Sequence, residues 1–282
     1  MNCYLCKSPE FVRRKGQVRD APELGIVQCT QCGLVSLDAI DHISSGFYEK
    51  SGMHGSEPAT IDAWLKETHW DDQRRFDMIK VFLPNKRLLD FGCGAAGFLE
   101  KANHLAAEVM GIELEERVRQ HWQGRLKIVP GTESAGTGFD LITAFHVLEH
   151  LPDPRGMLRT LSNLLAPGGR MIIEVPSSDD VLLSLYDCAA FQGFTYWSQH
   201  LFLFNAHTLE TIARQAGMRI VAIEHFQRYP LSNHLHWLSQ GGPGGHQRWG
   251  FLDTPELTAA YGNALAAIGK TDTLIAHLEP NT

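Results

Sequence analysis

The sequence lacks the features that mark a membrane or secreted protein. No apolar run approaches the roughly 18 residues that a membrane-spanning helix needs. The opening residues, MNCYLCKSPE, contain neither the basic segment nor the apolar segment of a secretory signal. These absences argue against a membrane role and predict a cytoplasmic location.

An excess of positive charge is also missing. The 282 residues include 25 Lys and Arg against 32 Asp and Glu, which gives a net charge of −7 at pH 7. Proteins that bind nucleic acid usually present a basic face, so the composition argues against such a partner. The chain has no internal repeats or low-complexity tracts, and its length fits one large domain with attachments. The oligomeric state stays open.

Cysteines are few, and four of the six lie near the N-terminus. They form two C-x-x-C pairs, Cys3 with Cys6 and Cys29 with Cys32. Two such pairs predict a four-thiolate zinc site, which is closed and therefore structural. Disulfides are the poorer explanation in a reducing cytoplasm, and a redox dithiol would need one pair only. We therefore expect residues 1–40 to form a zinc-binding module.

The rest of the chain divides into a connector and an alternating region. Residues 41–84 have aromatic side chains at helical spacing, including Phe47, Tyr48 and Trp64, and are predicted to be a helical connector. From residue 85 to 282, strand and helix patterns alternate, which predicts an α/β fold with a doubly wound parallel sheet. Residues of about 229–270 separate the last two strands and are rich in Gly, His and Trp, so we interpret them as a cap insertion over the acceptor.

The stretch LLDFGCGAAG, residues 88–97, contains G-x-G-x-x-G at the end of a predicted strand. Glycines at this point allow a tight turn and bring bare peptide close to a ligand. Asp90 would repel a pyrophosphate but attract an ammonium group. Glu113 ends the next strand, where a carboxylate can accept both hydroxyls of a ribose. The pair favours S-adenosylmethionine over a dinucleotide.

The segments LLDFGCGAAG, GIE, FDLITAFHVLEHL and LLAPGGRMIIEVP follow one another across roughly residues 86–176. In this order they resemble class I S-adenosylmethionine-dependent methyltransferases. The resemblance implies a Rossmann-like methyltransferase sheet, S-adenosylmethionine as the cofactor, and a small-molecule acceptor. Thr132 departs from the aspartate that the family usually has near the adenine, with Glu133 beside it. The cofactor-binding residues implied are Asp90, Gly92, Cys93, Gly94, Gly97, Glu113, Thr132, Phe145 and His146.

The N-terminal run CYLC…CTQCGLVSLD…FYEK is similar to a group of methyltransferases with zinc modules, among them sugar methyltransferases. In the sugar C-methyltransferases of that group, a Tyr-His-Glu-His run followed by LSYFS supplies the base. The matching stretch here is WSQHLFLFN, residues 197–205, and His200 corresponds to the last histidine. The resemblance implies that His200 is a catalytic base, with His146 as the other catalytic candidate. C-methylation does not follow, because the C-terminal third of those enzymes is missing.

A second interpretation concerns the run HVLEH. His146, Glu149 and His150, together with His200, resemble the cluster that binds a divalent cation in some metal-assisted O-methyltransferases, where the first ligand is usually glutamate. Alternatively, Glu149 and His150 cap the helix that begins near Pro152. Both interpretations stay open.

The acceptor is the least defined part of the prediction. Aromatic faces beside amides and imidazoles suit a polyhydroxylated acceptor, although ordinary loop packing would use the same residues. The predicted acceptor contacts are Tyr196, Tyr229, Asn233, His234, Trp237 and His246. The leading expectation is O-methylation of a sugar, sugar nucleotide or glycan precursor. The alternatives are an RNA base methyltransferase whose zinc module reads RNA, a sugar C-methyltransferase, and a non-enzymatic binding scaffold.

Overall fold

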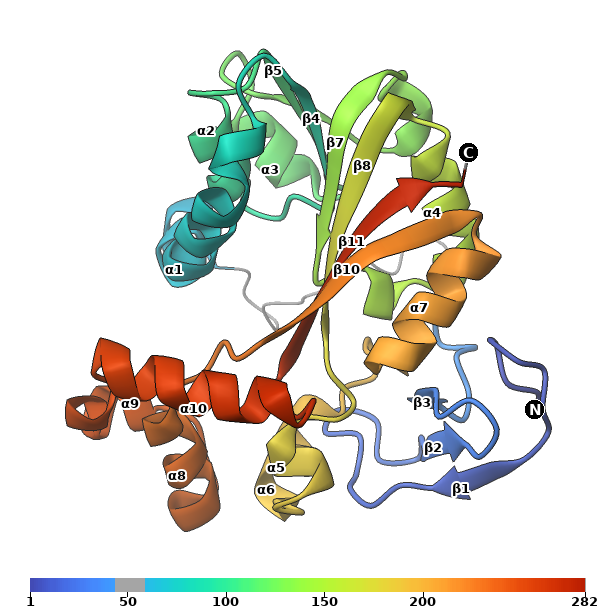
Figure 1. Cartoon of the computed structure of the whole chain (residues 1–282), viewed down its shortest axis with the longest axis vertical. Coiled ribbons are helices and arrows are strands. Elements are labelled where there is room, and N and C mark those ends of the chain that lie inside the picture. The colour runs from blue at the N-terminus through green and yellow to red at the C-terminus, as the bar shows by residue number, and fades with distance from the viewer. Residues whose placement is uncertain (44–58, 282) are drawn as a thin grey trace.

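The structure is a computed structural model that describes residues 1–43 and 59–281. Its centre is a seven-stranded sheet in the order β10-β11-β8-β7-β4-β5-β6 (Figure 1). The strands are β4 (Arg87–Phe91), β5 (Glu108–Ile112), β6 (Lys127–Val129), β7 (Phe139–Phe145), β8 (Leu165–Pro176), β10 (Met218–Phe226) and β11 (Thr273–Pro280). The five from β4 to β8 are parallel, which confirms the predicted α/β fold. One edge of the sheet is antiparallel, because β11 runs opposite to both β8 and β10.

Helices cover both faces of this sheet (Figure 1). One face has α1 (Ile61–Ile79), α2 (Gly97–Ala102) and α3 (Glu116–His121), and the other has α4 (Pro154–Ser162) and α7 (Ala206–Gln215). Local sequence fixes where several of them begin. Asp153 caps α4 just ahead of Pro154, and Asn205 and Thr208 form a capping box at the start of α7. Short 3-10 turns lie at η1 (Lys80–Phe82), η2 (Thr132–Ser134), η3 (Leu148–His150) and η4 (Gly250–Leu252).

Alternate residues of the central strands belong to two hydrophobic cores. Leu88 packs in the core beneath α1, α2 and α3, whereas Leu89 packs in the core on the α4 and α7 side. Ile172 and Ile173 divide in the same way. This is the period of two that an extended strand imposes on its side chains. The second core also includes Cys3 and other buried residues of the N-terminal segment.

The N-terminal segment forms a small antiparallel sheet of its own. Its strands are β1 (Phe11–Arg13), β2 (Ile26–Cys29) and β3 (Val35–Leu37), and β9 (Phe202–Leu203) completes it from far along the chain. Of the predicted helical connector, residues 61–79 are α1, and Phe47 and Tyr48 lie outside the described residues.

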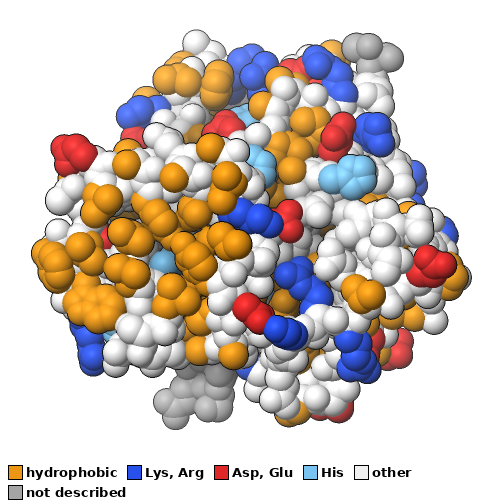
Figure 2. All heavy atoms as spheres, turned by 60° about the horizontal axis from the view of Figure 1, so that its bottom comes forward, with side chains coloured by type: hydrophobic (Ala, Val, Ile, Leu, Met, Phe, Trp, Pro, Cys, Tyr) orange, Lys and Arg blue, Asp and Glu red, His pale blue; other side chains and the backbone are white. Residues whose placement is uncertain are grey.

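Residues 229–270, predicted as a cap insertion, fold into helices between β10 and β11. These are α8 (Leu231–Gln240), α9 (Gly245–Arg248) and α10 (Pro255–Ala267), and α5 (Val181–Ser184) and α6 (Ala189–Thr195) lie beside them (Figure 1). Figure 2 shows hydrophobic side chains gathered on the outer face of this helical cap, where Phe251 is 76% exposed. Within residues 1–43 and 59–281, no helix combines the length and apolar character required to cross a membrane.

Candidate active site and cysteine cluster

A cavity of about 1020 Å³ lies at the carboxyl ends of β4, β5 and β7. Its size is at the upper end of the range typical of small-molecule sites. The wall includes the glycine loop after β4, the end of β5, the turn η2 and the segment that follows β7. Eight residues predicted to bind the cofactor therefore meet at one cavity: Asp90, Gly92, Cys93, Gly94, Glu113, Thr132, Phe145 and His146.

The glycine loop takes a backbone path that larger residues would disturb. Gly92 and Gly94 have φ angles of +71° and +52°, in the left-handed region that favours glycine. A Cβ atom on Gly92 would approach Val147 Cγ2 to 2.5 Å. Gly97 is not part of the cavity wall; a Cβ atom there would meet Asp72 Oδ2 at 2.3 Å, so this glycine allows α1 to pack closely. The loop thus leaves open peptide facing the cavity.

Two carboxylates flank this loop. Asp90 is 3% exposed at the end of β4 and accepts a hydrogen bond of 2.7 Å from Thr143 Oγ1. Burial raises the pKa of Asp90 to about 7. Glu113 accepts hydrogen bonds from the backbone N–H groups of Gly94 (2.9 Å) and Glu115 (3.0 Å), and burial raises its pKa too. A desolvated carboxylate gains most from a cation or from hydroxyl donors, which fits the ammonium and ribose groups of S-adenosylmethionine.

Helix α1 supplies cavity residues that sequence reasoning missed. Trp64, Thr68, Asp72 and Arg75 all line the cavity from this helix. Arg75 donates to Glu174 Oε1 from Nη2 at 2.7 Å and from Nε at 3.2 Å, and its guanidinium lies 4.8 Å from the centre of the Phe145 ring. The spacing of these residues, close to four along the chain, places them on one helical face. This stripe of residues on one face of the helix is the sequence feature that could have indicated a cavity wall, in a segment predicted only to be a connector.

His146 is held between two buried carboxylates. Its φ angle is +55°, which is uncommon for a residue with a side chain. Nδ1 lies 3.2 Å from Glu149 Oε1, and Nε2 lies 3.1 Å from Glu174 Oε1. Burial lowers the pKa of His146, but the hydrogen bonds and negative charges of Glu149 and Glu174 outweigh burial and raise it. A ring flanked by buried carboxylates on both sides is poorly placed to take a proton from an acceptor.

Glu149, His150 and His200 form a second group, with their ligand atoms within 4.8 Å of one another. Nδ1 of His150 lies 2.8 Å from the Gln199 carbonyl oxygen, and Nδ1 of His200 lies 3.1 Å from that of Thr195. When Nδ1–H donates to a carbonyl, the lone pair is on Nε2, and metal-binding histidines are commonly oriented in this way.

The carboxylate of this group also fits a cation. Glu149 is fully buried, and its Oε2 has no hydrogen-bond partner among the described residues. Burial lowers the pKa of His200 to about 4 and also lowers the pKa of His150, so both rings are neutral at pH 7. One carboxylate and two neutral imidazoles are a donor set that suits a divalent metal ion. His150 is also part of the cavity wall, so the group adjoins the cavity.

Within the described part of the chain, none of the six predicted acceptor contacts belongs to the cavity wall. Asn233 Oδ1 accepts from the Gly244 N–H at 3.1 Å, and His234 Nδ1 lies 2.8 Å from the Tyr261 hydroxyl. Trp237 is buried against aromatic rings of α6. Asn233, His234 and Trp237 therefore make their contacts within the cap and against α6. Tyr196 is buried, whereas Tyr229 and His246 are exposed.

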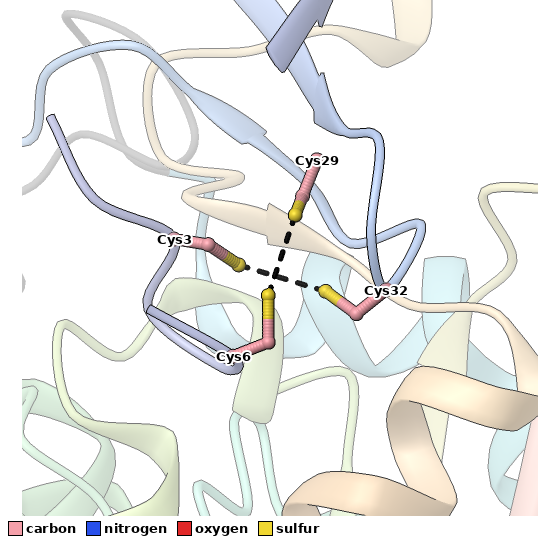
Figure 3. A group of neighbouring side chains, drawn as sticks. All are labelled: Cys3, Cys6, Cys29 and Cys32. Carbon is pink, nitrogen blue, oxygen red and sulfur yellow. Dashed lines mark hydrogen bonds between the residues drawn. The ribbon is translucent and has the colours of Figure 1, made fainter. Parts of the chain in front are cut away.

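The four N-terminal cysteines converge on one point (Figure 3). Cys3 Sγ lies 3.6 Å from Cys32 Sγ, and Cys6 Sγ lies 3.4 Å from Cys29 Sγ. Zinc–sulfur bonds of 2.3 Å in a tetrahedron would separate the sulfurs by about 3.8 Å. The cluster thus has both the donor set and nearly the spacing that zinc requires.

Comparison with known proteins places this architecture. A family described as "Methyltransferase domain" matches residues 53–223, more than half of the chain. A ubiquinone biosynthesis O-methyltransferase of Methylococcus capsulatus is 24% identical over 222 residues, covering 72% of this chain and 94% of the relative. One of the same name from Aeromonas salmonicida is 32% identical over 158 residues, covering 50% of this chain and 61% of the relative.

Solved structures agree on the fold. A SAM-dependent methyltransferase from Archaeoglobus fulgidus aligns with a TM-score of 0.51 at 19% identity, covering 74% of this chain and 93% of that one. A SAM-dependent methyltransferase from Thermotoga maritima, described as a possible histamine N-methyltransferase, aligns with a TM-score of 0.52 at 17% identity, covering 86% and 100%. With the family match and the predicted fold confirmed, the chain belongs to the methyltransferase-domain family and is an S-adenosylmethionine-dependent methyltransferase.

Proposed function

We propose that the enzyme methylates a hydroxyl group on an aromatic small molecule, with a divalent cation at Glu149, His150 and His200 assisting the transfer. The observation that supports this most is the buried carboxylate and imidazole group beside the cavity. The names of the relatives above, both O-methyltransferases, are consistent with an oxygen acceptor. A bound divalent cation would lower the pKa of an acceptor hydroxyl that it contacts.

In this proposal the chain holds the cofactor through three charged groups. Asp90 binds the ammonium of the methionine moiety, and Glu113 accepts the ribose hydroxyls. Arg75, which lines the cavity from α1, binds the methionine carboxylate. Such contacts fix the methyl group in line with the acceptor oxygen, and near-attack positioning can contribute roughly 7–11 kcal/mol to catalysis. With its pKa lowered by the bound cation, the acceptor hydroxyl would lose its proton to water. The oxygen would then form a bond to the methyl carbon while the carbon–sulfur bond breaks and S-adenosylhomocysteine leaves.

We assign His200 as a cation ligand in preference to the base expected from the sequence. A general base works best with a pKa near the operating pH, and that of His200 is about 4. His146 has a raised pKa and lies between two carboxylates, so we propose that it orients Glu149 and does not accept the proton.

The character of the cavity supports an aromatic acceptor. Its wall has an apolar part made of Trp64, Phe98, Phe145, Leu151 and Met157. Aromatic rings bury well against such a surface. The sugar acceptor expected from the sequence loses support, because the cap residues on which it rested lie outside the cavity wall.

Other parts of the prediction remain proposals. We propose a structural zinc ion at Cys3, Cys6, Cys29 and Cys32. A four-thiolate site needs reduced cysteines, so we also propose a reducing compartment such as the cytoplasm. An RNA-reading role for this module gains no support, since Arg13 pairs with Asp38, and Lys15 pairs with Asp187.

The test is methyl transfer from S-adenosylmethionine to simple catechols and phenols, with a sugar-nucleotide panel beside them. Activity should vanish in a chelator and return with Mg²⁺ or Mn²⁺, while elemental analysis shows that one zinc per chain is retained. Full turnover on catechols in the chelator would contradict the cation assignment. Methylation of sugars alone would contradict the aromatic acceptor.

A further inference from the structure

The N-terminal cysteine module, residues 1–43, contacts the segment that contains His200. Strand β3 pairs with β9 through Val35 with Leu203 and Ser36 with Phe202. The pairing extends one step further, because the Leu37 N–H donates to the Leu201 carbonyl at 3.1 Å. The module therefore hydrogen-bonds to the residue directly after His200.

Side chains of the module also hold the turn before His200. The Asp20 carboxylate accepts from the Ser198 N–H at 2.9 Å and from the Ser198 hydroxyl at 2.7 Å. His42 Nε2 lies 2.8 Å from the Ser198 carbonyl oxygen. Close by, the guanidinium of Arg19 lies 4.7 Å from the centre of a Trp197 ring. Asp20 and His42 thus hold the backbone of Ser198, and Arg19 contacts the side chain of its neighbour Trp197.

The same segment faces the proposed cation ligands on its other side. The Leu201 N–H donates to the Glu149 carbonyl at 2.9 Å, and the Gln199 carbonyl lies 2.8 Å from His150 Nδ1. Residues 196–201 lie between the end of α6 and the start of β9, outside any helix or strand. A segment of this kind retains a large conformational freedom unless contacts restrict it.

We propose that the cysteine module is a positioning element of the active site: it fixes residues 196–201 so that His200 meets Glu149 and His150. The inference rests on the proposed function for the identity of the bound ion. Asp20 is the positioning residue that can be tested most cleanly, because it acts through Ser198. In this proposal the four cysteines also support catalysis without touching either substrate, because they hold the loops from which β2 and β3 extend.

The experiment compares Asp20→Ala with wild type by two measurements on the full chain. Hydrogen–deuterium exchange reads the amides of His200 and Leu201, which donate to Trp197 and Glu149 carbonyls. Titration with Mn²⁺, followed by electron paramagnetic resonance of the free ion, reads the cation site. In Asp20→Ala the exchange rate of these amides should rise at least tenfold. Mn²⁺ should bind about 10- to 100-fold more weakly, the usual cost of losing a residue that orients metal ligands.

The controls separate positioning from general damage. Asp20→Asn keeps an acceptor oxygen and should restore most of the Mn²⁺ affinity, and Glu23→Ala, at an exposed position of the same loop, should behave as wild type. Affinity for S-adenosylmethionine should stay within twofold in every variant. Unchanged exchange in Asp20→Ala, or faster exchange with unchanged Mn²⁺ affinity, would overturn the inference. Failure of wild type to bind Mn²⁺ would instead contradict the proposed function, and the exchange rates would then decide the positioning role.

Discussion

The two halves of the cavity are built in different ways. The proposed cofactor half comes mainly from three neighbouring parallel strands, β4, β5 and β7, with groups between residues 90 and 146, and α1 adds Arg75 to it. The proposed acceptor half is assembled from α1, from η3 and from Arg228, which follows β10, and His200 adjoins it beside Glu149 and His150. Consecutive strand ends converge because of the fold itself, whereas the acceptor half needs contacts between segments far apart along the chain, such as Asp71 with Arg228. Changes in one half should therefore leave the other almost intact.

The largest expected effect comes from His200→Ala. Removing a proposed cation ligand should lower kcat by about 10²–10⁴-fold, the range for loss of acceptor activation, with S-adenosylmethionine affinity unchanged. Steady-state kinetics and calorimetry measure the two quantities. His207→Ala, at an exposed position of α7, is the matched control. Near-normal turnover of His200→Ala would remove this residue from the site.

Glu113→Ala should have the opposite selectivity. It removes charged hydrogen bonds to the proposed ribose, and we expect S-adenosylmethionine to bind about 1.5–3 kcal/mol more weakly. Mn²⁺ affinity should not change, because Glu113 lies in the cofactor half. Calorimetry with the two ligands tests both statements, with Glu100→Ala on the exposed side of α2 as the control. Loss of both affinities together would show that the two halves are not separable.

Asp90→Asn should have an effect of another kind, on stability, which depends on pH. The pKa of Asp90 rises from 3.8 to about 7 in the folded protein, so its ionisation disfavours the fold. That penalty is absent below about pH 4, grows up to pH 7 and is complete above it. In the cofactor-free protein, the stability of Asp90→Asn relative to wild type should therefore increase with pH, by at most about 1.4 kcal/mol per unit.

Thermal unfolding at several pH values follows this difference. Asp77→Asn is the control, since Asp77 is exposed and its hydrogen bonds to Lys80 and Gln73 lower its pKa. A Tm difference between Asp90→Asn and wild type that stays flat from pH 4 to 8 would mean that Asp90 is ionised without penalty.

The smallest effect is expected in the cap. His246→Ala alters an exposed side chain outside the cavity wall, so KM for the acceptor should stay within twofold. A tenfold increase in this KM would place the cap in the acceptor site.

The difference between the two halves of the cavity also explains which features the sequence could predict. The glycine loop, Glu113 and the alternating strands are local patterns. From them the sequence predicts the parallel strands and a site at their carboxyl ends. Strand β9 has two residues and exists only because β3 pairs with it, so no local pattern indicates it. No local pattern marks Arg75 as a site residue, because the residues around it indicate only a connecting helix. In α8, the sequence LSNHLHWLSQ suggested polar acceptor contacts, but burial within the cap uses Asn233 and His234 for packing.

The most direct test of the account is anomalous X-ray diffraction from crystals of the full chain grown with Mn²⁺ and S-adenosylhomocysteine. We predict a manganese peak bounded by Glu149, His150 and His200, and a zinc peak at the four cysteines. The adenosyl group should lie beside Glu113. A well-occupied cofactor with no manganese between those three side chains would contradict the central claim.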